Sequence, residues 1–300
     1  MSFSYDFIGV GGLSYDLLMR VARLPLADAK YPAELLDKMP GGFIANATCA
    51  AARLGLRSGY IGWVGDDPEG TMLYTDFLAW KVEPTGLVVV PGQVTPFTLV
   101  ITDAKGKRAI LIPSFPLYRA ELTYEQLALA GQARVLYSFP RDAVWCAQLR
   151  RASLDGGGLL ALDVENAVPM HGDELREALC LADVIFLTEE SLRKLRTKRL
   201  RDVAEGRQWV ILTAGKRGAW GLAGGMRKPI HQPAYHVPVV DSTGAGDTFH
   251  AALLAAKLEG ADLAEALRFA SAAAALKIQH RGARGGLPTH AEVEQQMLLG

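Results

Sequence analysis

The nine residues at 241–249, DSTGAGDTF, combine a carboxylate with a glycine-rich turn. An apolar run at 235–240 predicts a strand before them, and the spacing of apolar residues from Phe249 onward predicts a helix after them. Gly244, Ala245 and Gly246 would then lie at a helix N-terminus, where backbone N–H groups converge and bind an anion such as phosphate. Asp247 adds a carboxylate to that anion pocket. A carboxylate beside an anion-binding turn is explained if a phosphoryl group is transferred there and Asp247 accepts the proton of the attacking hydroxyl.

A plainer interpretation is also open. Acidic side chains are common in the first turn of a helix, so Asp247 could simply stabilise the start of that helix in an ordinary strand-to-helix turn. The residue types in this stretch alone do not decide between a catalytic base and an acidic residue that stabilises the helix start.

Composition indicates a globular protein without overall charge. Half of the residues are apolar and 21% are charged, and the 32 Lys and Arg residues equal the 32 Asp and Glu residues. This balance gives no reason to expect nucleic acid or an anionic membrane as a partner. No apolar run approaches the roughly 18 residues that cross a bilayer, and the N-terminal residues lack the features of a secretory signal.

Cysteine and histidine usage points to reduced thiols and to no metal site of that type. Cys49, Cys146 and Cys180 are scattered and form no CxxC pair, which predicts a cytoplasmic protein. The six histidines lack metal-ligand spacing. Six of the nine residues at 193–201 are basic, but no aromatic residue is interleaved, so we expect a solvated helix face rather than a nucleic-acid site.

The N-terminal region offers a second group of binding residues. A strand expected at 7–10 runs into glycines at 11–12, but Ser14 replaces the third glycine of a dinucleotide fingerprint, so a Rossmann dehydrogenase is a poor fit. Asp16 follows the carboxyl end of this strand, where ligands bind in open α/β sheets. Its two oxygens suit a pair of sugar hydroxyls, although a turn aspartate is an equal alternative from position alone.

A Gly-Gly pair opens the next expected helix, which continues to about residue 54. Gly41 and Gly42 allow a ligand to touch the backbone, and Asn46 offers both a hydrogen-bond donor and an acceptor. Residues 17–40 contain short extended pieces that we expect to be lid strands rather than core, and residues 86–113 contain three further extended runs.

From residue 134 the chain alternates strands and helices. We expect strands at 134–138, 158–163, 183–187 and 209–213, and helices at 143–154, 173–181, 189–195 and 202–205. Alternation of this kind predicts an α/β fold with a mostly parallel central sheet covered by helices on both faces. We expect residues 1–300 to form a single domain.

The pattern DSTGAGDTF closely resembles the second signature of the PfkB, or ribokinase-like, carbohydrate kinases. Gly41, Gly42 and Asn46 resemble the first signature, except that Ile44 stands where a small residue or proline is usual. The resemblance extends from Phe7 to the last helix. It implies a ribokinase-like fold in which segments 17–40 and 86–113 form a small β-sheet lid over the sugar. It also implies an ATP-dependent sugar kinase activity with Mg²⁺ and a homodimer formed through the lid.

The resemblance also assigns roles on the sugar side. Asp247 matches the catalytic base, and the turn at Gly244, Ala245 and Gly246 matches the anion hole. The residues that match the sugar contacts are Asp16, Gly41, Gly42 and Asn46.

On the nucleotide side, the resemblance places ATP over residues 213–218 and 272–286. The residues expected to contact ATP are Thr188, Thr213, Gly215, Gly218, Ala273 and Gly282. Thr188 and Ser191 replace the family's Asn-x-x-Glu, so Glu190, or its neighbour Glu189, is expected to act on Mg²⁺ through water. Asp241 matches an aspartate that can hold a monovalent cation such as K⁺.

The sugar is the open question. Residues 231–235, 268–271 and 275–277 look most like ketohexokinase and sulfofructose kinase, which favours a furanose ketose. Ribose remains an alternative, and so does a nucleoside, whose base could stack on Phe43, Phe97 or Phe115. A regulator that binds sugar or nucleotide without catalysis is the third, motivated by the altered Asn-x-x-Glu.

Overall fold

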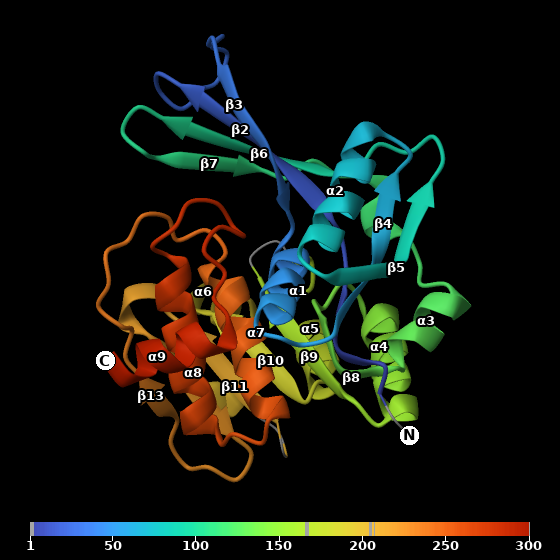
Figure 1. Ribbon diagram of the computed structural model, residues 1–300, viewed down its shortest axis with the longest axis vertical. Helices are drawn as coiled ribbons and strands as arrows, with labels where there is room; N and C mark the ends of the chain where they lie inside the picture. The colour runs from blue at the N-terminus through green and yellow to red at the C-terminus, as the bar shows by residue number, and fades with distance from the viewer. Residues whose placement is uncertain (1–2, 166–167, 204–205, 207, 300) are drawn as a thin grey trace.

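Two sheets of unequal size make up the computed structural model, which describes residues 3–165, 168–203, 206 and 208–299 (Figure 1). The large sheet has the strand order β13-β12-β11-β10-β9-β8-β1-β4-β5. Its strands are β1 (Tyr5–Val10), β4 (Ser58–Gly65), β5 (Val82–Val90), β8 (Ala133–Ser138), β9 (Leu159–Val164), β10 (Val184–Thr188), β11 (Trp209–Thr213), β12 (Ala219–Ala223) and β13 (Ile230–Gln232). All pairs from β5 to β11 are parallel, and β12 and β13 add antiparallel strands at one edge.

Helices cover both faces of this sheet, as the sequence predicts. One face packs against α1 (Phe43–Arg53), α2 (Pro68–Ala79), α7 (Ala245–Leu258), α8 (Leu263–Lys277) and α9 (His290–Leu299). The other packs against α3 (Tyr124–Ala130), α4 (Ala143–Gly156), α5 (Gly172–Cys180) and α6 (Glu189–Lys194). Among the described residues, no helix is long and apolar enough to cross a membrane.

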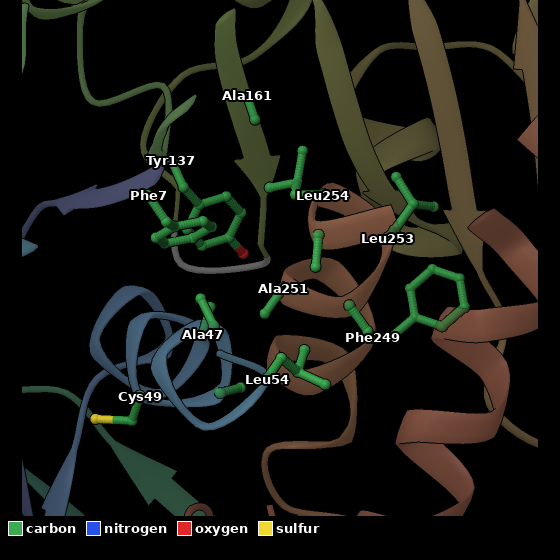
Figure 2. Close-up of a cluster of buried hydrophobic side chains, with 14 of the residues drawn as sticks. Phe7, Ala47, Cys49, Leu54, Tyr137, Ala161, Phe249, Ala251, Leu253 and Leu254 are labelled. Atoms are coloured by element: carbon green, nitrogen blue, oxygen red, sulfur yellow. The ribbon is translucent and has the colours of Figure 1, made fainter. Parts of the chain in front are cut away.

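Small side chains bring α1 and α7 together over the sheet. Ala47 on α1 and Ala251 on α7 are fully buried, and both helices lie close to Phe7 and Tyr137 of the sheet (Figure 2). Because alanine side chains let the two helix axes approach closely, this packing fixes the position of the N-terminus of α1 relative to the N-terminus of α7.

The small sheet is the lid, and it stands apart from the large sheet in Figure 1. It contains β2 (Ser14–Val21), β3 (Glu34–Gly41), β6 (Phe97–Asp103) and β7 (Arg108–Leu111) in the order β3-β2-β6-β7. The predicted lid segment 86–113 therefore began too early, because residues 86–90 belong to β5 and pair with β4 in the large sheet. The expected segment 17–40 covers most of β2 and β3 together with the connection between them.

Two other expectations need correction. Residues 235–240 form no strand before the glycine turn, because Pro238 has no N–H to donate to a ladder. The expected helix at 202–205 is replaced by a 3-10 turn over Leu200–Asp202, and residues 204–205 lie outside the described residues.

Candidate active site

The glycine turn opens α7 as predicted. Gly244 is the residue before the helix, with φ 78°, and a Cβ there would lie 2.2 Å from the carbonyl oxygen of Ala283. A Cβ on Gly246 would instead meet nothing within 4 Å, so open space adjoins the helix N-terminus. The backbone N–H groups of Gly246 and Asp247 donate to no acceptor among the described residues. This combination of open space and free donors is what an anion requires.

Asp247 lies in the first turn of α7 and is 8% exposed. Nδ2 of Asn46, in the first turn of α1, donates a 2.9 Å hydrogen bond to its Oδ2. Burial raises the pKa of Asp247 to about 6, against the opposing effect of the Asn46 hydrogen bond. A carboxylate with such a pKa is ionised at neutral pH and still basic enough to take a proton in a reaction.

Asp16 and Gly41 lie against each other at the base of the lid. A Cβ on Gly41 would be 2.7 Å from Oδ1 of Asp16, so only glycine leaves room for this carboxylate. Burial also raises the pKa of Asp16 to about 6. Gly42, with φ 89°, turns the chain from β3 into α1, and Asn46 N–H donates to its carbonyl oxygen.

Arg284 joins these predicted residues, and the sequence did not single it out. Its Nε lies 3.0 Å from Oδ1 of Asn46, and its Nη2 lies 3.1 Å from the carbonyl oxygen of Gly41. Its Nη1 pairs with the carboxylate of Asp76 on α2. The structure therefore brings Asp16, Gly41, Gly42, Asn46 and Asp247 into one region around this guanidinium.

A buried polar cluster behind Asp247 was also missed. Oη of Tyr137 donates a 2.6 Å hydrogen bond to Oδ2 of Asp163 at the end of β9, and Nδ1 of His250 lies 3.1 Å from the same oxygen. Burial alone would lower the pKa of His250, but the Asp163 carboxyl raises it above its ordinary value. His250 directly follows the DSTGAGDTF pattern and lies one turn beyond Asp247, a spacing that could have drawn attention to it.

Asp241 fastens the glycine turn to the loop after α8. Its Oδ1 accepts hydrogen bonds from N–H and Oγ1 of Thr243 at 3.0 and 2.7 Å, and its Oδ2 accepts one from Gly282 N–H at 3.0 Å. Burial would raise the pKa of Asp241, but these hydrogen bonds hold it below its usual value. The lid reaches this point too, because Nη1 of Arg108 on β7 donates to Oγ1 of Thr243 at 3.0 Å.

The expected ATP contacts lie mostly at the carboxyl ends of β10 and β11. Thr188 and Thr213 end these strands side by side, in register. Gly215 and Gly218 follow β11 with φ 54° and 86°, and a Cβ on Gly218 would be 2.1 Å from the carbonyl oxygen of Gln232.

Ala273 and Gly282 differ in what they can offer a nucleotide. Gly282 has φ 78° and touches the lid, because a Cβ there would be 2.6 Å from Cε of Met39. The structure does not place Ala273 at an open surface: it is fully buried between α8 and the core, with no exposed area. The next residue, Ala274, is only half-buried.

The residues that replace the family's Asn-x-x-Glu cap a helix. Oγ1 of Thr188 and Oγ of Ser191 lie 2.8 Å apart in a capping box at the start of α6. Within the described residues, no group of three or more His, Cys, Asp or Glu side chains could hold a metal ion alone. Glu190 is exposed in the first turn of α6, beside Thr188. This arrangement fits Mg²⁺ that arrives with the nucleotide and keeps most of its water.

Comparison with known proteins shows which family the chain belongs to. The pfkB family carbohydrate kinase pattern matches residues 8–290. Ribokinase of Bacillus subtilis (strain 168) is 30% identical over 302 residues, covering 95% of this chain and 97% of that protein. Fructokinase-1 of Oryza sativa subsp. japonica is 30% identical over 318 residues, covering 97% of each.

The fold agrees as well. The structure of Arabidopsis thaliana ribokinase complexed with ribose and ATP superimposes with a TM-score of 0.85 at 25% identity, covering 99% of each chain. Since the family pattern and these relatives span nearly its whole length, the chain belongs to the pfkB family of carbohydrate kinases.

Proposed function

We propose that this protein transfers the γ-phosphoryl group of ATP to a hydroxyl of a small sugar, with Asp247 as the catalytic base. The observation that carries the proposal is the arrangement at the start of α7. A buried carboxylate, oriented by Asn46, adjoins open space at Gly246 and free backbone donors. Binding alone has no use for a base in that place, which favours catalysis over a regulator that only binds.

In the proposed reaction, Asp16, Gly41, Gly42 and Asn46 hold the sugar beneath the lid. The sugar hydroxyl oxygen attacks the γ-phosphorus, the bond from phosphorus to the β–γ bridging oxygen breaks, and ADP leaves. Asp247 takes the hydroxyl proton, and the N–H groups at the start of α7 stabilise the charge on the phosphoryl oxygens. Glu190 would hold Mg²⁺ through water, and the ion would supply positive charge to neutralise the ATP phosphates.

The nucleotide is proposed to lie across Thr188, Thr213, Gly215, Gly218 and Gly282. Two strand ends and three glycines allow close approach of adenosine and phosphates to the backbone. A K⁺ ion at Asp241 stays a prediction, and both oxygens of that carboxylate already accept hydrogen bonds from the chain.

A ketose or pentose is the proposed substrate class, and relatives named fructokinase and ribokinase support it. One observation favours a nucleoside as the second candidate. Phe97 and Phe115 pack edge to face with ring centroids 5.2 Å apart, and Tyr118 follows at 5.8 Å from Phe115. Tyr118 interacts electrostatically with Asp16, so this aromatic group borders the sugar side of the site.

The test is ADP release from ATP·Mg²⁺ with a panel of fructose, sulfofructose, ribose, tagatose, 2-keto-3-deoxygluconate, adenosine and inosine, with and without K⁺. Asp247→Asn serves as the blank. One strong responder that the variant loses would support the proposal and name the substrate class. ATP binding by calorimetry without turnover of any acceptor would favour a binding protein instead.

We also propose a cytoplasmic homodimer formed through the lid. The lid presents exposed apolar side chains at Leu35, Leu36, Ile110, Leu111 and Ile112, which a second lid would cover. The three free cysteines agree with a reducing compartment. Sedimentation of the wild-type protein and of Ile110→Asp would test the dimer, since a charge in the interface should shift the protein to monomer.

A further inference from the structure

Arg284 is a buried arginine in the loop between α8 and α9, 6% exposed. Its guanidinium donates to three separate parts of the chain. Nη2 reaches the carbonyl oxygen of Gly41 at the end of lid strand β3, Nε reaches Oδ1 of Asn46 on α1, and Nη1 pairs with Asp76 on α2. Burying an arginine is costly unless its donors are used, and here each of the three nitrogens has a partner.

The guanidinium determines which way the Asn46 amide faces. Arginine can only donate hydrogen bonds, so the amide group beside Nε must be the oxygen. The amide NH₂ is then turned toward Oδ2 of Asp247, at 2.9 Å. A flipped amide would set donor against donor at Arg284 and oxygen against oxygen at Asp247. The hydrogen bond from Asn46 to Oδ2 thus fixes the orientation of the Asp247 carboxylate.

The positive charge also acts on both carboxylates of the site. The Arg284 guanidinium lowers the pKa of Asp16 and of Asp247 against the larger effect of burial. The other titratable side chains that interact with Asp247 are Tyr137 on β8, Asp163 on β9, His250 on α7 and Lys277 on α8.

We propose that Arg284 is a positioning residue for phosphoryl transfer, which locks the Asn46 amide toward Asp247 and ties the end of β3 to the loop after α8. The inference rests on the proposed role of Asp247. The alternative is that Arg284 only braces α2 and the lid through Asp76. The two roles differ in whether loss of the guanidinium changes kcat and its pH dependence, which report on Asp247.

Four variants separate these roles: Arg284→Ala, Arg284→Gln, Asn46→Ala and the double variant Asn46→Ala/Arg284→Ala. Gln can still donate to the Gly41 carbonyl, but it lacks the charge and no longer forces the amide to face one way. Arg53→Ala is the matched control, because Nε of Arg53 lies 3.2 Å from the carbonyl oxygen of Leu287 and so joins the far end of α1 to the same C-terminal region.

The measurements are kcat and KM as functions of pH, with ATP affinity by calorimetry and thermal unfolding for each variant. We expect both Arg284 variants to lose about 10- to 100-fold in kcat, since a misplacement of about 1 Å costs about 100-fold. We expect the acid limb of kcat to move to higher pH, ATP affinity to hold, and Arg53→Ala to match wild type. Added ethylguanidinium should restore part of the kcat of Arg284→Ala.

The double variant gives the sharpest result. If Arg284 acts through Asn46, removing it in the Asn46→Ala background should add little further loss in kcat. Additive losses, or wild-type kcat and an unmoved acid limb in Arg284→Gln, would overturn the inference while leaving Asp247 as the base. Full activity of Asp247→Asn would instead overturn the proposed function.

Discussion

Asn46 and Asp247 stand 201 residues apart in the chain, and the amide Nδ2 of the first lies 2.9 Å from the carboxylate Oδ2 of the second. Each belongs to the first turn of its helix, and both helices begin at a glycine with positive φ. The packing of α1 on α7 thus brings the side chain proposed to bind the sugar and the one proposed to accept its proton to hydrogen-bonding distance.

Removing the carboxylate charge should abolish most of the turnover. Asp247→Asn keeps the shape and still accepts a hydrogen bond from Asn46, but it cannot take up a proton. We expect kcat to fall about 10²- to 10⁴-fold, the usual contribution of a positioned base. Coupled assay of ADP release measures it, with Asp37→Asn on the exposed lid strand as a matched control. Turnover near wild type would remove Asp247 from the mechanism.

The pH profile should report two carboxylates. In the proposed reaction Asp16 accepts hydrogen bonds from the sugar and Asp247 accepts a proton, and burial raises the pKa of each to about 6. We therefore expect kcat/KM to rise with pH through about 6 and then to level. Initial rates across a constant-ionic-strength buffer series give the profile. An acid limb near 4, the ordinary range for carboxylates, would contradict it.

The same burial predicts that Asp247 destabilises the fold at neutral pH. Its folded pKa of about 6 exceeds the ordinary 3.8, so the folded protein binds the proton more tightly than the unfolded chain. This favours folding below about 3.8, and the benefit is lost as pH rises through about 6. Asp247→Asn should therefore be more stable than wild type at pH 8, by up to about 3 kcal/mol, and the gain should shrink toward pH 4. Urea unfolding at both pH values tests the sign, and an equal difference at the two would refute it.

Two glycines in one turn should respond differently to a methyl group. In Gly244→Ala, the new Cβ would meet the Ala283 carbonyl at 2.2 Å with φ at 78°, so we expect a loss of at least about 2 kcal/mol in the free energy of unfolding. Gly246→Ala has open space, so stability should be unchanged or slightly higher. Its turnover should still fall about 10- to 100-fold, because the methyl group occupies the place proposed for the phosphoryl group. Unfolding curves and kcat for the pair decide; an active Gly246→Ala would argue against the anion pocket.

Tyr137→Phe should be destabilising, because it removes only the hydroxyl that donates to Asp163 inside the core. Asp163 is 1% exposed and cannot turn to water for a replacement. We expect a loss of about 1 to 3 kcal/mol in the free energy of unfolding. Tyr74→Phe on the exposed side of α2 is the control, with no loss expected.

Much of the fold could be predicted from the order of strand and helix patterns along the chain. Alternation of apolar runs with helical patterns predicted strands β8 to β11 and helices α4 to α6, because parallel sheets need a crossover connection, usually a helix, between strands. The edge strand β5 was harder to assign to the correct sheet. Its residues look as extended as those of the lid, and only pairing with β4 decides which sheet takes them. Residues 235–240 failed for the opposite reason, since an apolar run that contains Pro238 cannot complete a ladder.

The candidate site could be predicted where residue types and their spacing form a pattern that is typical of a reaction. Asp247 with its glycine turn, and Asn46 after Gly41 and Gly42, are unusual combinations in one chain. Arg284 is a common residue type without a local pattern, and His250 has only its position directly after the DSTGAGDTF pattern. Their meaning comes from partners 238 and 87 residues away, Asn46 and Asp163, which no local window contains.

The place of β1 inside the large sheet, between β4 and β8, bears on how the protein is made. A nascent chain leaves the ribosome N-terminus first, so the lid and α1 emerge long before the glycine turn exists. Until α7 is synthesised, the small-residue face of α1 lacks the helix that packs on it, and Asp16 and Asn46 lack the proposed base Asp247. Arg284 arrives later still. Sugar phosphorylation is therefore a property of the finished polypeptide, and an unfinished one on the ribosome cannot consume ATP in this way.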